Sequence, residues 1–213
     1  MSNSLLPISK PSIGKNLVSF DGELEEEGSY LDFLFNSKSF IAKNIKNIRF
    51  SNSQFEKVDF SNTNFPKLYI SDCIFTDCSL ANANWNESTF KSVEINNSRI
   101  TGLQVNESSL QDIVFKDCKI DYAQFQYLKS KRVKFERCIL TNAYFQGSDL
   151  TGVIFEDCDL SQTDFSECIL KNADFSGSKL SGMKVDINRL NNATFDNNQI
   201  YYLIQLLGIN ISH

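Results

Sequence analysis

Residues 135–175 read FERCILTNAYFQGSDLTGVIFEDCDLSQTDFSECILKNADF, and every fifth residue of this stretch, from Phe135 to Phe175, is phenylalanine or leucine. The spacing continues in both directions without insertion or deletion, from Phe40 to Ile200, and Ser130 is the only polar residue among its 33 positions. A period of five fits neither an α-helix, whose period is 3.6, nor a flat β-strand, whose period is two. The sequence therefore predicts a solenoid built from a short repeat that contains a turn.

Charged residues separate the inside of this repeat from its outside. Two of every five positions are expected to point inward: the fifth residue, here called the centre, and the residue two before it, here called the slot. Between residues 40 and 200 no Asp or Glu occupies a centre or a slot, and Lys43 is the only Lys or Arg that does. Because burial of an unpaired charge is costly, this exclusion predicts a dry, apolar interior.

The cysteines follow the same register. All of them lie in slots, where small or medium-sized side chains prevail: Cys73, Cys78, Cys118, Cys138, Cys158 and Cys168. A free cysteine packs like a small apolar residue, the chain has no Cys-x-x-Cys pair, and its single histidine is His213. We therefore expect buried, reduced and inert thiols, and neither a disulfide nor a metal site.

Other features of the chain argue against catalysis and membrane insertion. Thiols are expected to face inward and carboxylates outward, and there is no glycine-rich phosphate loop, so no catalytic constellation and no cofactor are predicted. The 213 residues carry a net charge of −5. Neither a signal peptide nor an apolar run long enough to span a bilayer is present, and we expect a soluble cytoplasmic protein.

Several repeats resemble a known family. Ala143-Tyr144-Phe145, Thr163-Asp164-Phe165 and Ala173-Asp174-Phe175 are similar to the pentapeptide-repeat pattern, which is Ala-(Asp or Asn)-Leu-X-X with Leu or Phe at the centre. This resemblance implies an all-β solenoid, a right-handed quadrilateral β-helix with four repeats per coil. The sequence supports four repeats independently, because centres taken every twenty residues form phenylalanine columns that alternate with aliphatic columns from Phe115 onward. About eight such coils would make a rod on the order of 40 Å long.

Both ends of a rod of this kind expose open sheet edges, which need caps. Residues 1–35 are predicted to form an irregular, partly disordered tail and an entry coil, and residues 36–196 to form the β-helix. In residues 197–213 we expect a short α-helix. Asp196 and Gln199 have the spacing of a capping box, and an amphipathic helical spacing follows in Ile200, Leu203, Ile204 and Leu207.

The C-terminal segment has more apolar residues than a cap requires. Two interpretations remain open: a cap that packs only on its own chain, and a symmetric end-to-end dimer contact. The residues predicted for the dimer contact are Tyr201, Leu203, Ile204, Leu206, Leu207 and Ile209.

The same end narrows the resemblance to one branch of the family. Asp196-Asn197-Asn198-Gln199, with Leu207-Gly208-Ile209 after it, resembles the C-terminus of the quinolone-resistance (Qnr) proteins. Val185-Asp186-Ile187-Asn188 resembles the microcin B17 immunity branch. These resemblances imply a homodimer that mimics DNA, binds DNA gyrase or topoisomerase IV, and protects the enzyme from a quinolone or a peptide toxin. The loops that interrupt the coils of Gram-negative Qnr proteins have no counterpart here. The alternative is an interaction or effector-targeting module that does not bind topoisomerases.

Charges assigned to the four faces by register make the rod two-sided. The face centred on Phe55, Phe75 and every twentieth residue onward to Phe195, here called the acidic face, has nine acids against four bases. The proposed partner-binding residues on it are Glu56, Asp77, Glu94, Asp117, Glu136, Glu156, Asp157 and Asp174. Imitation of DNA phosphates is one interpretation of this face, and a solvated face that keeps the rod soluble is the other.

The face centred on Phe50, Ile70 and onward to Leu190, here called the basic face, has three acids against seven bases. A basic patch surrounds the one polar centre and consists of Lys129, Lys131, Arg132, Lys134 and Arg137. Three interpretations remain open for this patch: charges balanced by neighbouring carboxylates, a protein contact, and nucleic-acid binding. We rank them in that order because the chain is negative overall, and we expect no direct contact with nucleic acid.

Overall fold

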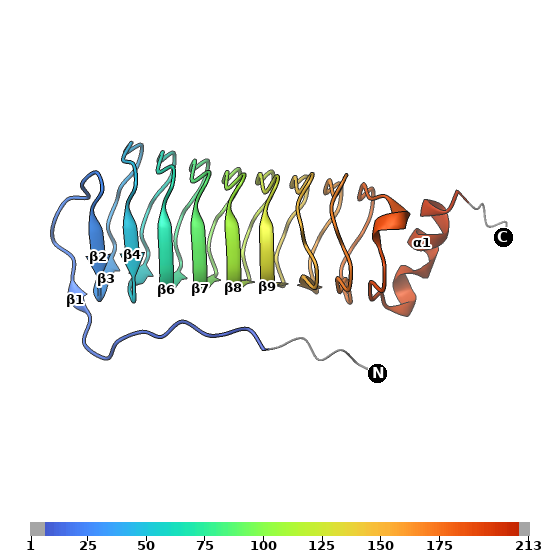
Figure 1. The fold of residues 1–213 in the computed structure, drawn as a ribbon, viewed down its shortest axis with the longest axis horizontal. Coiled ribbons are helices and arrows are strands. Elements are labelled where there is room, and N and C mark those ends of the chain that lie inside the picture. The colour runs from blue at the N-terminus through green and yellow to red at the C-terminus, as the bar shows by residue number, and fades with distance from the viewer. Residues whose placement is uncertain (1–6, 209–213) are drawn as a thin grey trace.

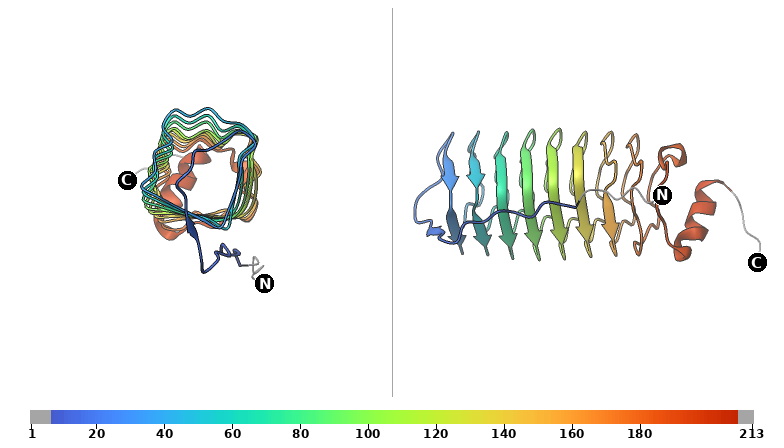
Figure 2. Two further views of the ribbon diagram at one scale, coloured as in Figure 1. Left: turned by 90° about the vertical axis from the view of Figure 1, so that its left-hand side faces the viewer. Right: turned by 60° about the horizontal axis from the view of Figure 1, so that its bottom comes forward.

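The chain forms a right-handed parallel β-helix with four-sided coils and a short C-terminal helix, as the sequence predicts. A computed structural model describes residues 7–208. The coils stack into a straight rod (Figure 1), and the view along the rod shows a square outline (Figure 2). No helix among the described residues is long and apolar enough to cross a membrane.

Ten strands form one parallel sheet that wraps around the rod, and short helices follow them at the C-terminal end. The strands are β1 (Val18–Ser19), β2 (Ser29–Leu31), β3 (Phe33–Asn36), β4 (Arg49–Ser51), β5 (Gln54–Glu56), β6 (Tyr69–Thr76), β7 (Thr89–Asn96), β8 (Ser109–Lys116), β9 (Lys129–Glu136) and β10 (Ile154–Glu156). Two 3-10 helices, η1 (Ile187–Arg189) and η2 (Asn197–Gln199), precede the α-helix α1 (Ile200–Leu206).

Nearly every coil pairs with the next in a register of twenty residues, as in Phe115 opposite Phe135 and Phe135 opposite Phe155. On the acidic face, the strands β3, β5, β6, β7, β8, β9 and β10 follow one another over about six turns. Isolated bridges then continue the ladder from Ile154 through Asp174 to Thr194. The register therefore sets each outward side chain directly above the residue twenty positions later.

The corners of the square explain why the repeat has five residues. From Glu27 to Asn192, the residues whose numbers end in 2 or 7 have a positive φ angle, with Ile187 of η1 as the exception. This left-handed conformation turns the chain once per repeat and is tolerated best by Gly, Asn and Asp. The four sides of one coil are thus centred in order on Phe115, Ile120, Phe125 and Ser130. The side centred on Phe125 is opposite the acidic face.

Phenylalanine rings fill the interior in two columns. Phe135 stacks on Phe115 at 4.7 Å between ring centroids and on Phe155 at 5.1 Å. In the second column, Phe125 stacks on Phe145 at 4.9 Å. Rings of different columns meet edge to face, the arrangement that their quadrupoles favour. The polar centre Ser130 is half-buried, and its hydroxyl donates to the Asp149 carbonyl oxygen at 2.8 Å, so its polar group is satisfied.

Both columns are interrupted in the same coil. Ile95 separates Phe75 from Phe115, and Val105 separates Trp85 from Phe125. A small apolar cavity lies at this interruption, lined by Leu80, Trp85, Phe90, Ile95, Leu103, Val105, Leu110, Ile113, Phe115 and Phe125. Ile95 and Val105 are smaller than the aromatic residues at the equivalent positions of other coils. The side chains around the cavity therefore lose van der Waals contacts.

Val105→Ile is expected to raise the free energy of unfolding by about 0.5–1 kcal/mol, since it adds one buried methylene next to this cavity. Val153→Ile is the matched control. Val153 is 1% exposed in a coil where the columns are continuous, so the added methylene should cost about 1 kcal/mol through overpacking. Urea unfolding followed by circular dichroism measures both. Equal changes in the two variants would contradict the assignment of a defect to this coil.

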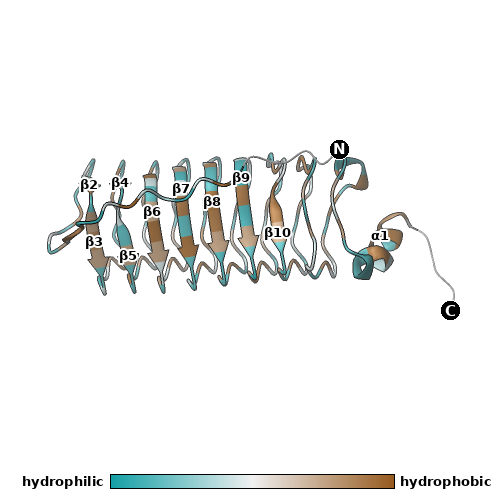
Figure 3. Ribbon diagram, turned by 90° about the horizontal axis from the view of Figure 1, so that it is seen from below, coloured by the Kyte–Doolittle hydropathy of each residue, from teal (hydrophilic) through white to brown (hydrophobic). Residues whose placement is uncertain are grey.

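Residues 7–17, here called the strap, lie along the outside of the rod. The strap runs back from β1 across the coils of β3 toward β9 (Figures 1 and 3). The Ser12 amide donates to Asp72 Oδ1 at 3.0 Å, and the Ser9 amide donates to Asp112 Oδ1 at 3.0 Å. Asp72 and Asp112 occupy the corner between the basic and acidic faces, in β6 and β8. The entry coil behind the strap buries Phe20, Leu24 and Tyr30.

The C-terminal end is closed by the predicted capping box. The Asp196 side chain accepts from the Asn198 amide, and the Gln199 side chain accepts from the Asp196 amide at 2.8 Å. Gln199 is also buried against the last complete coil, where its Nε2 donates to the carbonyl oxygens of Phe175 and Ser178, each at 2.7 Å. These bonds satisfy backbone acceptors that the end of the sheet would otherwise leave unpaired.

Candidate protein-interaction surface

The acidic face runs along strands β5 to β10 and continues past them. Its candidate residues differ in exposure: Glu56, Asp77, Asp117, Glu156 and Asp157 are exposed, whereas Glu94, Glu136 and Asp174 are half-buried. The strands hold these carboxylates in the fixed register of twenty residues, so neighbours along the rod are separated by one or more coil spacings of about 4.8 Å.

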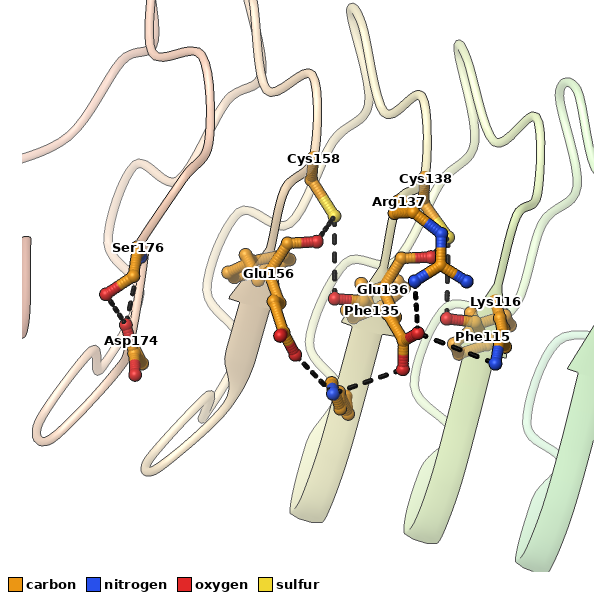
Figure 4. A network of polar contacts seen from close by, with 12 residues as sticks. Phe115, Lys116, Phe135, Glu136, Arg137, Cys138, Glu156, Cys158, Asp174 and Ser176 are labelled. Atoms are coloured by element: carbon orange, nitrogen blue, oxygen red, sulfur yellow. Dashed lines mark hydrogen bonds and ion pairs between the residues drawn. The ribbon is translucent and has the colours of Figure 1, made fainter. Parts of the chain in front are cut away.

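The middle of this face is an ion-pair network (Figure 4). Glu136 in β9 lies 3.1 Å from Lys134 Nζ and 3.6 Å from Lys116 Nζ, and it also pairs with Arg137. Lys134 also pairs with Glu156 of the next coil, and Arg137 Nε lies 2.7 Å from Asp117 Oδ1 of the preceding coil. The network thus connects three successive coils and neutralises the centre of the face.

These contacts move the pKa values of the carboxyl groups involved. Burial alone would raise the pKa of Glu136, but hydrogen bonds from Lys134 and Arg137 outweigh burial and hold it below its usual value. The hydrogen bond from Arg137 likewise lowers the pKa of Asp117. Both carboxylates are therefore charged at neutral pH and are already occupied by bases of their own chain.

Two groups of carboxylates flank the network. Among the described residues, Glu56, Asp77 and Glu94 on one side, and Asp157 and Asp174 on the other, form no ion pair with Lys or Arg. Asp77 accepts a hydrogen bond from Asn97, and Asp174 accepts from the Ser176 amide at 2.9 Å (Figure 4). These unpaired groups, rather than the whole face, are available to a basic partner.

The five residues of the predicted basic patch do not share one environment. Lys134 and Arg137 belong to the network on the acidic face, and Arg132 pairs with Asp112 at the corner. Lys129 and Lys131 in β9 are exposed and form no ion pair among the described residues. Three of the five charges are thus balanced by neighbouring carboxylates, and within the patch only Lys129 and Lys131 are uncompensated.

The corner at Asp112 joins the strap to the rod. Asp112 is 2% exposed, accepts from both Nε and Nη2 of Arg132, and accepts from the Ser9 amide. The hydrogen bond from Arg132 is the main reason why the pKa of Asp112 falls to about 2, and the Ser9 amide adds to it. Sequence reasoning missed this contact, because it joins residues 103 positions apart through a backbone amide that carries no sequence signal.

Acid is expected to weaken this junction in a defined pH window. The pKa of Asp112 is about 2 in the folded chain and 3.8 as its ordinary value. Its ionised form therefore stabilises the fold fully above about pH 4, and this contribution is lost as the pH falls toward and through 2. Carboxyl NMR titration should show the Asp112 midpoint near pH 2, with the Ser9 amide shift following it. Asp112→Asn should abolish the amide transition. A midpoint near 3.8 would contradict the pairing.

The C-terminal helix exposes part of its apolar surface. Tyr201 is 51% exposed and Leu207 57% exposed, whereas Leu203, Ile204 and Leu206 are half-buried. Tyr202 turns toward the coil, where its hydroxyl donates to the Met183 carbonyl oxygen. The predicted contact residue Ile209 lies outside the described residues. One side of α1 thus caps the rod, and Tyr201 and Leu207 remain open to a partner.

The interior carries no reactive arrangement within the part of the chain that the structure describes. All six cysteines are free and buried. Burial raises the pKa of the thiols of Cys73 and Cys168 to about 12, and that of Cys78 to about 11. Residues 7–208 contain no group of three or more His, Cys, Asp or Glu side chains that could hold a metal ion. Protonated thiols of this kind are poor nucleophiles and poor ligands.

Comparison with known proteins supports the repeat architecture. Residues 48–125 and 128–204 match the family described as pentapeptide repeat region. The structure is similar to HetL, a pentapeptide repeat protein involved in heterocyst differentiation regulation in the cyanobacterium Nostoc sp. strain PCC 7120, with 14% identity and a TM-score of 0.50, over 79% of this chain and 87% of HetL. No curated protein sequence matches the chain.

A second similar structure is QnrB1, a plasmid-mediated fluoroquinolone resistance protein. Its trypsin-treated R167E form has 22% identity and a TM-score of 0.44, over 87% of this chain and 100% of that one. The full-length form has 22% identity and a TM-score of 0.36, over 85% of this chain and 100% of that one. Similarity at this level carries no information on partners.

Proposed function

The chain belongs to the pentapeptide-repeat family, and from that premise we propose that it is a non-catalytic protein that binds DNA gyrase or topoisomerase IV through its acidic face. In this role it occupies a surface of the enzyme that otherwise receives DNA, and it protects the enzyme from a quinolone or a peptide toxin. Such a protein acts in the cytoplasm and needs no cofactor. The C-terminal resemblance to the Qnr and microcin B17 immunity branch directs the choice of enzyme.

The observation that carries the proposal is the pair of unpaired carboxylate groups on one side of a straight rod. Asp77 and Asp157 are four coils apart in the same corner column, which corresponds to about 19 Å along the rod. A positively charged DNA-binding groove attracts carboxylates for the same reason that it attracts phosphates. The neutral network between the groups divides the face into two contact regions.

One observation favours a second function. The network around Glu136 already satisfies three bases and three acids on the same face, so part of the acidic face is compensated internally. A general protein-interaction or effector-targeting module without topoisomerase binding needs no continuous acidic surface. The fold itself is compatible with either function.

Supercoiling and DNA-cleavage assays with purified gyrase and topoisomerase IV separate the two functions. Each assay is run with and without this protein, and with and without a quinolone or a peptide toxin. We expect less poison-induced cleavage when the protein is present, together with a change in supercoiling activity. No effect on either enzyme at micromolar protein concentrations would favour the interaction module.

We also propose that the C-terminal segment makes an end-to-end homodimer contact through Tyr201 of α1 and Leu207 directly after it, the two predicted contact residues that are exposed. Leu207→Asp should weaken this dimer at least about tenfold, because a buried unpaired carboxylate is costly at an interface. The capping bonds of Gln199 are untouched by this change. Sedimentation velocity measures the effect, with Lys184→Asp on the rod as the control. Unchanged association in Leu207→Asp would refute the helix contact.

A further inference from the structure

Between its corners, the face opposite the acidic face has no charge over four consecutive coils, and its nearest charges are Glu87 and Glu107 at one corner. Its outward residues between the corners, in chain order, are Asn84, Asn86, Gln104, Asn106, Gln124, Gln126, Tyr144 and Gln146. We call this surface, together with the exposed corner residues Tyr122 and Tyr127, the amide face. Across the whole chain 22% of the residues are charged, so an uncharged surface of this length is a distinct feature of the rod.

The amides of this face are held in place from coil to coil. The Asn106 backbone amide donates to Asn86 Oδ1 at 2.7 Å, and the Gln126 backbone amide donates to Asn106 Oδ1 at 2.9 Å. Gln126 Nε2 donates to Gln146 Oε1 at 3.4 Å. A side-chain amide has two N–H donors and two acceptor lone pairs. Each therefore keeps both donating and accepting capacity for a molecule that lies on the face.

Three tyrosines project from the same surface within two neighbouring coils. Tyr122 and Tyr127 are each 54% exposed and Tyr144 is 42% exposed. The Tyr127 ring lies over Gly147 of the next coil, where a β-carbon would approach Tyr127 Cε1 to 2.6 Å. The absence of a side chain at Gly147 thus lets this ring lie close against the backbone, a preorganised position that costs little entropy on binding.

We propose that the amide face binds the amide face of a second copy of this chain. Charge selects this occupant. The acidic and basic faces each carry an excess of one sign and would repel a copy of themselves. The amide face is uncharged between its corners, so it meets its copy with little like-charge repulsion. A two-fold contact also requires a surface that complements itself. The amide face meets this requirement because each of its side-chain amides carries both donors and acceptors.

The composition is that of a contact surface. Interface cores are depleted in charged residues and enriched in tyrosine, and tyrosine is frequent among the residues that dominate binding energy. Tyrosines supply rigid contact area, and asparagine and glutamine supply adaptable hydrogen bonds. In a pair joined this way the two acidic faces point outward on opposite sides. The contact is lateral and independent both of the helix α1 and of topoisomerase binding.

A single engineered thiol tests the contact in the full chain. All six native cysteines are buried, so Gln126→Cys introduces the one accessible thiol among the described residues. We expect rapid oxidation of Gln126→Cys to a covalent dimer. The control is Thr141→Cys on a neighbouring face, and it should cross-link slowly. Thr141 is half-buried, as Gln126 is. Equal rates in the two variants would overturn the proposal.

Substitution of the tyrosines provides the second measurement. Tyr122→Lys, Tyr127→Lys and Tyr144→Lys together should weaken lateral self-association at least about tenfold, since truncation of central aromatic residues usually costs most of the binding energy. Sedimentation velocity is run in the Leu207→Asp background, which removes the proposed helix contact. Circular dichroism checks that the coil is retained. A Leu207→Asp chain that is monomeric at all concentrations would contradict the lateral contact and leave the proposed gyrase function untouched.

Discussion

Phe135→Ala is expected to lower the free energy of unfolding by about 3–5 kcal/mol, because the ring is fully enclosed and its removal leaves a cavity that the coil cannot close. Phe135 is 1% exposed, stacks on Phe115 and Phe155, and meets Phe125 and Phe145 edge to face. Each coil contacts only the coil before it and the coil after it, so a cavity in a central coil weakens the packing against both neighbours. Urea unfolding followed by circular dichroism measures the loss.

The control for this substitution is an outward side chain on the opposite face of the rod, outside the core. Gln124→Ala changes a half-buried side chain on the outer surface and should alter stability by less than about 0.5 kcal/mol. A loss below about 1 kcal/mol in Phe135→Ala would mean that the stacked rings contribute far less than their burial implies.

The second large effect concerns partner binding. Reversal of two unpaired carboxylates, Glu94→Lys with Asp157→Lys, is expected to weaken gyrase binding about 10- to 100-fold, since each change replaces an attraction to the basic groove with a repulsion. Both side chains are free of ion pairs with Lys or Arg among residues 7–208, so no internal bridge is broken. The dependence of affinity on salt should also become shallower.

Glu107→Lys with Glu167→Lys is the matched control for this experiment. Both are exposed corner residues away from the acidic face, in the column of Tyr127 at the edge of the amide face. The double substitution changes the net charge by the same amount. The affinity of the control for gyrase should stay within about threefold of the unchanged protein, because salt screens charges that lie far from the contact. Equal losses in the two double variants would assign the effect to net charge and not to the acidic face.

The sequence predicted the coil because one local rule decides it. A centre every fifth residue predicted the repeat, and the family resemblance implied four-sided coils. Columns of like centres supported the register of twenty, and in the structure Phe115 stacks on Phe135. The left-handed corners were found only in the structure. The capping box at Asp196 and Gln199 is equally local and was confirmed. The alternating columns were also predicted from Phe115 onward, whereas the small cavity beside Ile95 and Val105 was not.

The sequence was less informative about surfaces, because surface contacts depend on geometry between coils. The sequence analysis assigned Lys134 and Arg137 to a basic patch. In the structure both lie beside carboxylates, which are Glu136, Glu156 and Asp117. The strap has no periodicity at all, and its bonds use backbone amides of Ser9 and Ser12. The net charge of each face could be counted from the sequence. The structure was needed to find which of these charges are unpaired.

Competition with DNA tests the proposed role of the acidic face most directly. Labelled protein is bound to purified gyrase, and duplex DNA is added at constant salt while fluorescence anisotropy reports the bound fraction. We expect DNA to displace the protein from gyrase in full. We also expect the affinity of the protein for gyrase to fall in the double variant Glu94→Lys, Asp157→Lys and to be retained in the control Glu107→Lys, Glu167→Lys. Binding that persists under saturating DNA, or no binding at micromolar concentrations, would contradict the proposal that this face takes the place of DNA.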